Sequence, residues 1–142
     1  MNKRRALAVA AMAVGLSGQA SPPRYAEGQV WEYRTRPGES GSRLKIQKVE
    51  TSPAAPGAEP IYHISVIGFR LRNPRIAPLL PHAPVTRETL DKSVTRLSAG
   101  APVFPGAEEG IAEWRRARGG VYTIGVAAII DTLDRQLAGA TE

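Results

Sequence analysis

The first twenty residues decide how much of this 142-residue chain is available to fold. Three basic residues at positions 3–5 precede an uninterrupted run of small apolar residues over 6–16, and small residues lead up to Ala20. This order of a basic, an apolar and a small-residue region is typical of a secretory signal peptide. We therefore expect residues 1–20 to be a signal peptide, residues 21–142 to form a single domain, and the mature protein to be periplasmic or secreted after cleavage near Ala20.

The remaining residues must fold without covalent cross-links, because the chain has no cysteine. About 120 residues can bury roughly two thirds of their unfolded surface, so a hydrophobic core is sufficient to stabilise a domain of this size. The apolar run of the leader is shorter than the ~20 residues that span a bilayer, and no longer run follows it. We expect no transmembrane segment once the leader is removed.

Net charge argues against binding to nucleic acid. The formal charge of +6 includes the three basic residues of the leader, and the rest of the chain has 16 basic and 13 acidic residues. Proteins that bind nucleic acid concentrate basic residues on one surface. A net charge of +3 spread over the mature chain does not predict such a surface.

Alternating apolar and polar residues predict three strands. Residues 29–36 and 43–50 alternate on either side of a turn-forming segment, which predicts a β-hairpin. In residues 61–72 the apolar positions change parity part-way along the segment. A bulge near Gly68 would bring all the apolar side chains to one face and leave His63 and Ser65 outward, whereas a regular strand would turn these two inward. We favour the bulge.

The second half of the chain predicts a connector and three helices. Residues 73–85 contain four prolines and are expected to be a connector. Thr86 is a suitable N-cap for a helix whose apolar stripe continues to Leu97. A second helix is expected over 107–118, ended by two glycines, and a third begins at Val126, where apolar residues recur at helical spacing. A short strand is expected between the last two helices.

The resulting order of elements is β-β-β-α-α-β-α. Segregation of strands and helices favours an α+β fold over a parallel α/β sheet. We expect a small antiparallel sheet of three to four strands, packed on one face by about three helices.

The sequence contains few residues suited to catalysis. Its only histidines are His63 and His82, and none of the short motifs for metal-dependent proteases, serine hydrolases or nucleotide binding is present. His63 and Ser65 share one face of a strand, which permits a base and a nucleophile to lie close together, but no acid or oxyanion hole is evident. We expect no catalytic residue, no metal site and no cofactor.

Seven residues are candidates for a ligand or partner surface. The outward face of the sheet carries several basic and polar side chains, which suits an anionic small ligand or an acidic protein, although a solvated sheet face explains them equally simply. His82 lies between prolines that recur every three residues, a spacing that suits either a rigid connector or a polyproline docking segment. The candidates are Arg34, Lys45, His63, Ser65, Arg70, Arg72 and His82.

The stretch from 25 to 50 resembles a group of short exported bacterial proteins of unknown function. It carries the pattern Y-x-x-G-x-V-W-x-Y-x-x-R-P-G-E followed by L-x-I-x-K-V-E. The likeness continues through residues 61–66, 82–97 and 119–124. It implies a bacterial source and a self-contained domain, and it implies no activity and no catalytic residue.

These observations favour a non-enzymatic periplasmic or secreted module that binds a periplasmic protein or an anionic small ligand. Two alternatives remain open. One is a small hydrolase-like or metal-assisted enzyme that uses His63 and Ser65, and the other is a structural protein of the cell envelope.

Overall fold

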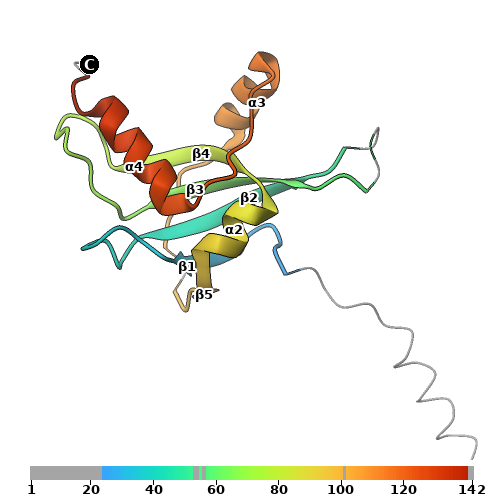
Figure 1. Cartoon of the computed structure of the whole chain (residues 1–142), viewed down its shortest axis with the longest axis horizontal. Helices are drawn as coiled ribbons and strands as arrows, with labels where there is room; N and C mark the ends of the chain where they lie inside the picture. Colours follow the sequence, from blue (N-terminus) through green and yellow to red (C-terminus); the bar gives the residue numbers. More distant parts are fainter. Residues whose placement is uncertain (1–23, 53–54, 56, 101, 141–142) are drawn as a thin grey trace, which may run out of the picture.

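The computed structural model describes residues 24–52, 55, 57–100 and 102–140, and it shows an α+β fold (Figure 1). The predicted signal peptide lies outside the described residues. In chain order, the elements are β1 (Val30–Tyr33), β2 (Arg43–Glu50), β3 (Ile61–Ile67), β4 (Leu79–Val85), α2 (Arg87–Ser93), β5 (Val94–Leu97), α3 (Glu108–Ala117) and α4 (Val126–Leu137).

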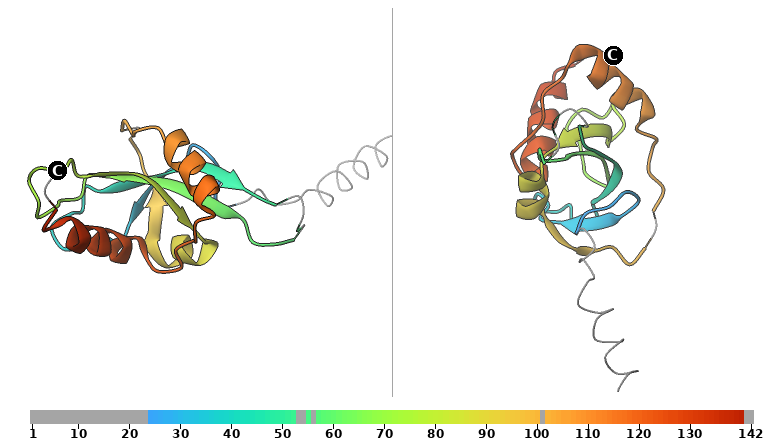
Figure 2. Two further views of the ribbon diagram at one scale, coloured as in Figure 1. Left: turned by 90° about the horizontal axis from the view of Figure 1, so that it is seen from above. Right: turned by 90° about the vertical axis from the view of Figure 1, so that its right-hand side faces the viewer.

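The strands form one sheet in the order β4-β3-β2-β1-β5, and every neighbouring pair is antiparallel. Helices α2 and α4 lie on one face of this sheet and α3 lies on the other (Figure 2). The expected α+β class with an antiparallel sheet is confirmed. The sheet has five strands rather than three to four, and the expectation that all the helices pack on one face is wrong, because α3 covers the opposite face.

The predicted hairpin is present as β1 and β2. Trp31 faces Leu44 across the hairpin, and both side chains are buried together with Tyr33 and Ile46. They form the inner face of the sheet, against which α2 and α4 pack. The alternation seen in the sequence therefore identified the core-facing residues of β1 and of the first half of β2, whereas a register shift between Ile46 and Lys48 lets Val49 pack against the same core.

The change of face near Gly68 is confirmed, although the segment is a shorter strand than expected. β3 ends at Ile67, and Gly68 adopts a left-handed conformation with φ of 83°. This turn of the backbone returns Phe69 to the same core as Tyr62, Ile64 and Val66, and Leu71 packs partly against that core. Residues without a glycine's freedom rarely adopt such a φ value.

The expected connector over 73–85 is wrong in its second half. Leu79–Val85 forms strand β4, which pairs with β3 although it contains Pro81 and Pro84. β4 lies at the edge of the sheet, where a proline does not remove a hydrogen bond to a second neighbouring strand. His82 therefore belongs to the sheet and not to a docking segment.

The helix expected from Thr86 to Leu97 is only half as long. Thr86 is the N-cap, as predicted, and its side chain accepts a hydrogen bond from the Thr89 amide at 3.3 Å. The helix ends at Ser93, and Val94–Leu97 turns into strand β5, which pairs with β1. Position 97 fitted a helical stripe, but Leu97 is 53% exposed at the sheet edge.

The two later helices are found where the sequence predicts them. Val126, Ile129 and Ile130 of α4 are buried in the core. α3 ends through Arg118, with a left-handed φ of 52°, and not through the glycines that follow. The short strand expected between these helices is reduced to one parallel bridge between Val85 and Tyr122.

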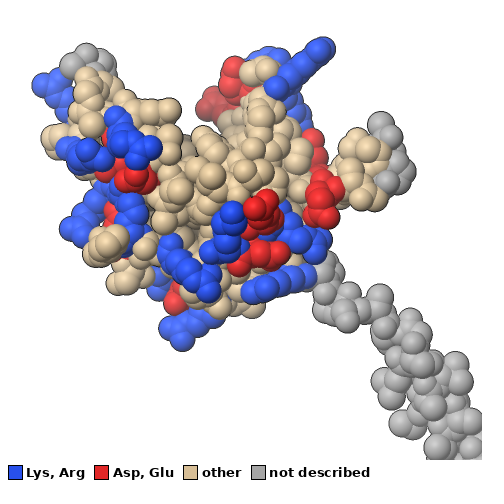
Figure 3. Space-filling model, viewed as in Figure 1, with Lys and Arg blue, Asp and Glu red and all other residues tan. Residues whose placement is uncertain are grey.

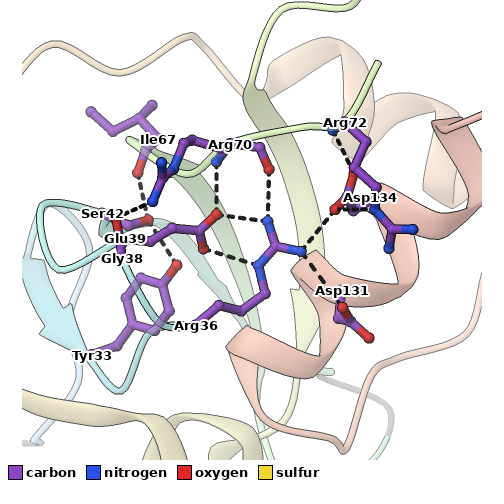
Figure 4. A network of polar contacts seen from close by, with 10 residues as sticks. All are labelled: Tyr33, Arg36, Gly38, Glu39, Ser42, Ile67, Arg70, Arg72, Asp131 and Asp134. Carbon is purple, nitrogen blue, oxygen red and sulfur yellow. Dashed lines mark hydrogen bonds and ion pairs between the residues drawn. The ribbon is translucent and has the colours of Figure 1, made fainter. Parts of the chain in front are cut away.

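A polar network centred on Arg36 connects α4 to the sheet (Figure 4). Arg36 donates to both carboxylate oxygens of Glu39, at 3.0 and 2.6 Å, and to Asp134 of α4 at 3.0 Å. Asp134 also accepts from the backbone and side chain of Arg72, and these hydrogen bonds lower the pKa of its carboxyl to about 2. Glu39 and Asp134 are each only 4% exposed. The network joins the β1–β2 turn, the segment after β3 and the last helix.

Candidate functional site: a buried histidine cluster and an aromatic cleft

The two histidines of the chain lie side by side beneath α3. His63 is in the middle of β3 and is fully buried, and His82 is in β4 and is half-buried. Their rings stack with centroids 5.0 Å apart, and His63 Nδ1 lies 2.8 Å from His82 Nε2. Antiparallel pairing of β3 with β4 places both residues on the outer face of the sheet, away from the main core.

A carboxylate and an arginine extend this pair on its other side. His63 Nε2 lies 3.1 Å from Glu50 Oε1 at the end of β2, and the same oxygen accepts from Arg115 of α3 at 2.7 Å. The edge of Trp114 meets the His63 ring, with centroids 5.0 Å apart. We refer to Glu50, His63, His82, Trp114 and Arg115 as the histidine cluster.

The hydrogen-bond partners assign the protons. A carboxylate only accepts hydrogen bonds, so His63 Nε2 carries the hydrogen that it donates to Glu50. Nδ1 of the same ring then accepts from His82 Nε2. The other ring nitrogen of His82 has no partner among the described residues, and no buried side-chain nitrogen or oxygen there lacks one, so this nitrogen contacts solvent. It is the free basic atom of the cluster.

Burial keeps both imidazoles neutral near pH 7. Burial lowers the pKa of His63; Glu50 opposes this, while the charges of Arg115 and Lys48 add to it. Burial and the neighbouring His63 lower the pKa of His82 to about 4. The hydrogen bond from Arg115 lowers the pKa of the Glu50 carboxyl, so this group remains a carboxylate.

Ser65 lies on the same face as His63, as the spacing predicts, but it belongs to a separate set of hydrogen bonds. Its hydroxyl donates to the Pro81 carbonyl at 2.6 Å and accepts from Gln47 at 3.1 Å. Gln47 also donates to the carbonyl of Pro105, 2.9 Å away. Ser65 thus connects β3 to β4 and to the segment that leads into α3.

Three of the other four predicted surface residues lie elsewhere on the fold, and the fourth, Lys45, pairs with Ser65. Arg34 donates to backbone carbonyls at Lys92 and Val94. Arg70 and Arg72 take part in the Arg36 network, at the end of the sheet near α4. Lys45 is half-buried in β2, opposite Ser65. The structure brings together His63, His82 and Ser65, and the seven candidates do not form a single surface.

Basic and acidic side chains are interspersed on the face of the molecule that Figure 3 shows. Across the described residues several basic and acidic side chains form ion pairs, such as Arg96 with Glu32 at 3.0 Å. Towards the left and lower edges of this view basic side chains outnumber acidic ones, whereas towards the right acidic side chains lie among them.

Sequence reasoning missed Glu50, Trp114 and Arg115. Arg115 lies near the end of its helix, where a basic residue is already explained by its favourable interaction with the helix dipole. Only the crossing of α3 over the outer face of the sheet brings Arg115 to Glu50. The one available signal was Glu50 itself, an acidic residue at the end of a strand that pairs with the strand of His63.

An aromatic cleft opens beside Trp114. It has a volume of about 400 Å³ and is lined by Pro84, Trp114, Gly120, Val121 and Tyr122. Trp114 Nε1 donates to the carbonyl of Gly120 at 2.9 Å, and the backbone of Tyr122 bonds to that of Pro84 at 2.9 Å. The first bond fixes the Trp114 ring and the second fixes the backbone of Tyr122, which is 40% exposed. We refer to this site as the aromatic cleft.

The histidine cluster is not arranged to chelate a metal. Both nitrogens of His63 are engaged in opposite directions, and no three metal-ligating side chains converge anywhere in the described part of the chain. None of the helices in the described ranges combines the length and the apolar character needed to cross a membrane. No protein-family model matches the sequence, and neither the curated proteins nor the solved structures give a match.

Proposed function

We propose that this chain is an exported bacterial binding module and that the aromatic cleft is its contact site. The observation that carries the proposal is the pair of aromatic residues beside a proline, with the Trp114 ring held by its hydrogen bond to Gly120 and the backbone of Tyr122 held by its bond to Pro84. Ordered, partly exposed aromatic side chains around a mainly apolar hollow are typical of sites that bind peptides and small molecules. The leader-like first twenty residues support export, and the likeness over 25–50 supports a bacterial source.

The shape and chemistry of the aromatic cleft favour an apolar segment of a periplasmic protein. The lining presents aromatic rings and a proline, and it contains no charged side chain. An apolar or aromatic side chain from a partner would bury area against Trp114 and Tyr122. No charged group of the cleft would have to be removed from water in the process.

The hydrolase alternative receives less support from the geometry. Its nucleophile would be Ser65, whose hydroxyl hydrogen is committed to the Pro81 carbonyl and whose side chain is fully buried. An activated serine needs a base as its hydrogen-bond acceptor and access to a substrate. Ser65 instead links β3 to β4 through its hydrogen bond to the Pro81 carbonyl.

Site-specific photo-crosslinking in cells tests the proposal. A photoreactive phenylalanine analogue replaces Tyr122, and the matched control carries it at Leu97, an exposed apolar residue in the edge strand β5. We expect a discrete adduct from position 122 and none from position 97. Equal labelling at both positions, or none at position 122, contradicts a binding role for the cleft.

The same preparation tests export. The intact mass of protein from the envelope fraction is expected to match a chain that begins at Ser21. A mass that includes residues 1–20 in protein from the cytoplasm would contradict export.

A further inference from the structure

Helix α3 has a weaker apolar attachment to the fold than α4 has. Ile111 is the one buried residue within α3. By contrast, α4 buries Val126, Ile129 and Ile130 in the main core. The position of α3 must therefore depend strongly on its other contacts.

Those other contacts fall on the histidine cluster. A Cβ atom added at Gly110 would lie 2.5 Å from Cβ of His82, so the helix backbone packs directly on this histidine. The Trp114 ring lies nearly perpendicular to that of His63, and Arg115 bonds to Glu50. The state of the two imidazoles thus determines the surface on which α3 sits.

The short contact between the imidazoles limits how many protons the pair can hold. A distance of 2.8 Å between His63 Nδ1 and His82 Nε2 accommodates one hydrogen between the two nitrogens. One additional proton is compatible with the contact, because a charged His63 can donate to both Glu50 and His82. A second is not, since both facing nitrogens would then carry hydrogen and both rings a positive charge.

We propose that His63 and His82 form an acid-sensitive latch that releases helix α3 from the outer face of the sheet when both imidazoles are protonated. The latch requires no ligand in the aromatic cleft. Because Trp114 belongs to α3 and lines the cleft, release also dismantles the cleft, and only this consequence rests on the proposed function.

The charged groups around the pair agree with release in acid. They are Lys48 and Glu50 from β2, Arg115 from α3 and, around the depression next to Pro81, Glu109, Glu113 and Arg116. Lys48 and Arg115 oppose added positive charge, and the single carboxylate in contact with the rings, Glu50, is already paired with Arg115. It can compensate for one charged imidazole but not for two.

The direction of the pH effect follows from the lowered pKa values. An exposed histidine has a pKa of about 6.5, and burial lowers that of His82 to about 4. The closed position of α3 is therefore fully favoured above about pH 6.5 and loses stability as the pH falls towards about 4. From the two His82 values alone, linkage raises the opening constant of α3 about 20-fold between pH 7 and pH 5.

Amide hydrogen exchange of the wild-type protein measures this opening. Exchange rates are corrected for their intrinsic pH dependence and read separately for α3 and for α4. We expect the protection of α3 to fall about 20-fold over that range while the protection of α4 is retained. Equal loss of protection in both helices would mean acid unfolding of the whole domain and would overturn the latch.

The variant His82→Gln separates the latch from other acid effects. A glutamine amide can still donate a hydrogen bond towards His63, but it does not titrate. We expect its α3 protection to depend on pH less steeply than that of the wild type over the same range, because His63 still titrates, and an unchanged pH dependence would overturn the proposal. Should this variant fail to fold, the ¹⁵N signals of the wild-type imidazoles give the second measurement. Protonation of both imidazoles must coincide with loss of α3 protection, and protonation of both rings without such loss also overturns the latch.

Discussion

Replacing Gly68 by alanine tests whether the backbone at the end of β3 sets the course of the chain. Gly68 has a φ of 83°, and a Cβ atom there would lie 3.0 Å from both the Gly41 oxygen and the Ser42 Cα. Both neighbours are backbone atoms of the β1–β2 turn. They cannot move aside as the end of a flexible side chain could, so the substitution combines conformational strain with a steric conflict.

Gly28 provides a matched control that isolates the first of these two costs. It has a similar φ of 92°, and nothing lies within 4 Å of a Cβ atom built on it. A left-handed conformation costs a non-glycine residue about 1–2 kcal/mol, and the stiffer unfolded chain offsets about 0.4–1 kcal/mol of that. We therefore expect Gly28→Ala to lower the free energy of unfolding by about 1 kcal/mol.

Gly68→Ala carries the same cost and an overpacking cost of about 1–3 kcal/mol. Its total loss is then about 2–4 kcal/mol, and urea unfolding followed by circular dichroism measures the difference between the two variants. With a slope of about 1–2 kcal/mol per molar urea, the midpoint of Gly68→Ala falls about 0.5–3 M below that of Gly28→Ala. Equal midpoints would refute the claim that the β1–β2 turn crowds Gly68.

Three further predictions concern the Arg36 network and the aromatic cleft. Arg36→Ala should lower the free energy of unfolding by about 3 kcal/mol in urea titrations, because Glu39 is left buried and unpaired, and Arg36→Lys should restore only part of this. The pKa of Asp134 is depressed to about 2, so its contribution to folding stability is fully present above the pKa of an unfolded aspartate, near 4, and is lost as the pH falls towards 2. Thermal unfolding of Asp134→Asn should therefore show a shallower fall in stability over that range. Gly119→Ala would place a Cβ atom 2.4 Å from Cδ1 of Trp114 and should shift tryptophan fluorescence, and an unchanged spectrum would contradict the packing of this ring.

The sequence predicted those parts of the fold that depend on local patterns. Alternation identified the β1–β2 hairpin, a single threonine marked the start of α2, and helical spacing located α4. It failed where tertiary position overrides local preference. The prolines of β4 are tolerated only because that strand lies at an edge, and Val94–Leu97 leaves the helical pattern because β1 offers it a pairing partner.

The candidate site was only partly predictable for the same reason. The parity of residues 61–72 indicated that His63 and Ser65 share a face, and the structure confirms that they do not face the main core. Nothing in the local sequence places His82 beside His63, since that contact needs β4 to be a strand. The roles of Glu50 and Arg115 likewise require α3 to cross the outer face of the sheet.

The Arg36 network also has a consequence for when the chain can fold. Arg36 and Asp134 are 98 positions apart, and the buried carboxylate of Asp134 completes a set of bonds whose other members come from the first half of the domain. Contacts of such sequence separation form late and slow the folding of a domain. In the export route proposed above, a chain that crosses a membrane from its amino end would remain without its closing helix until residues 126–137 emerge. The part of the domain that has already crossed would then lack these long-range bonds, and folding would be completed only after α4 has followed it.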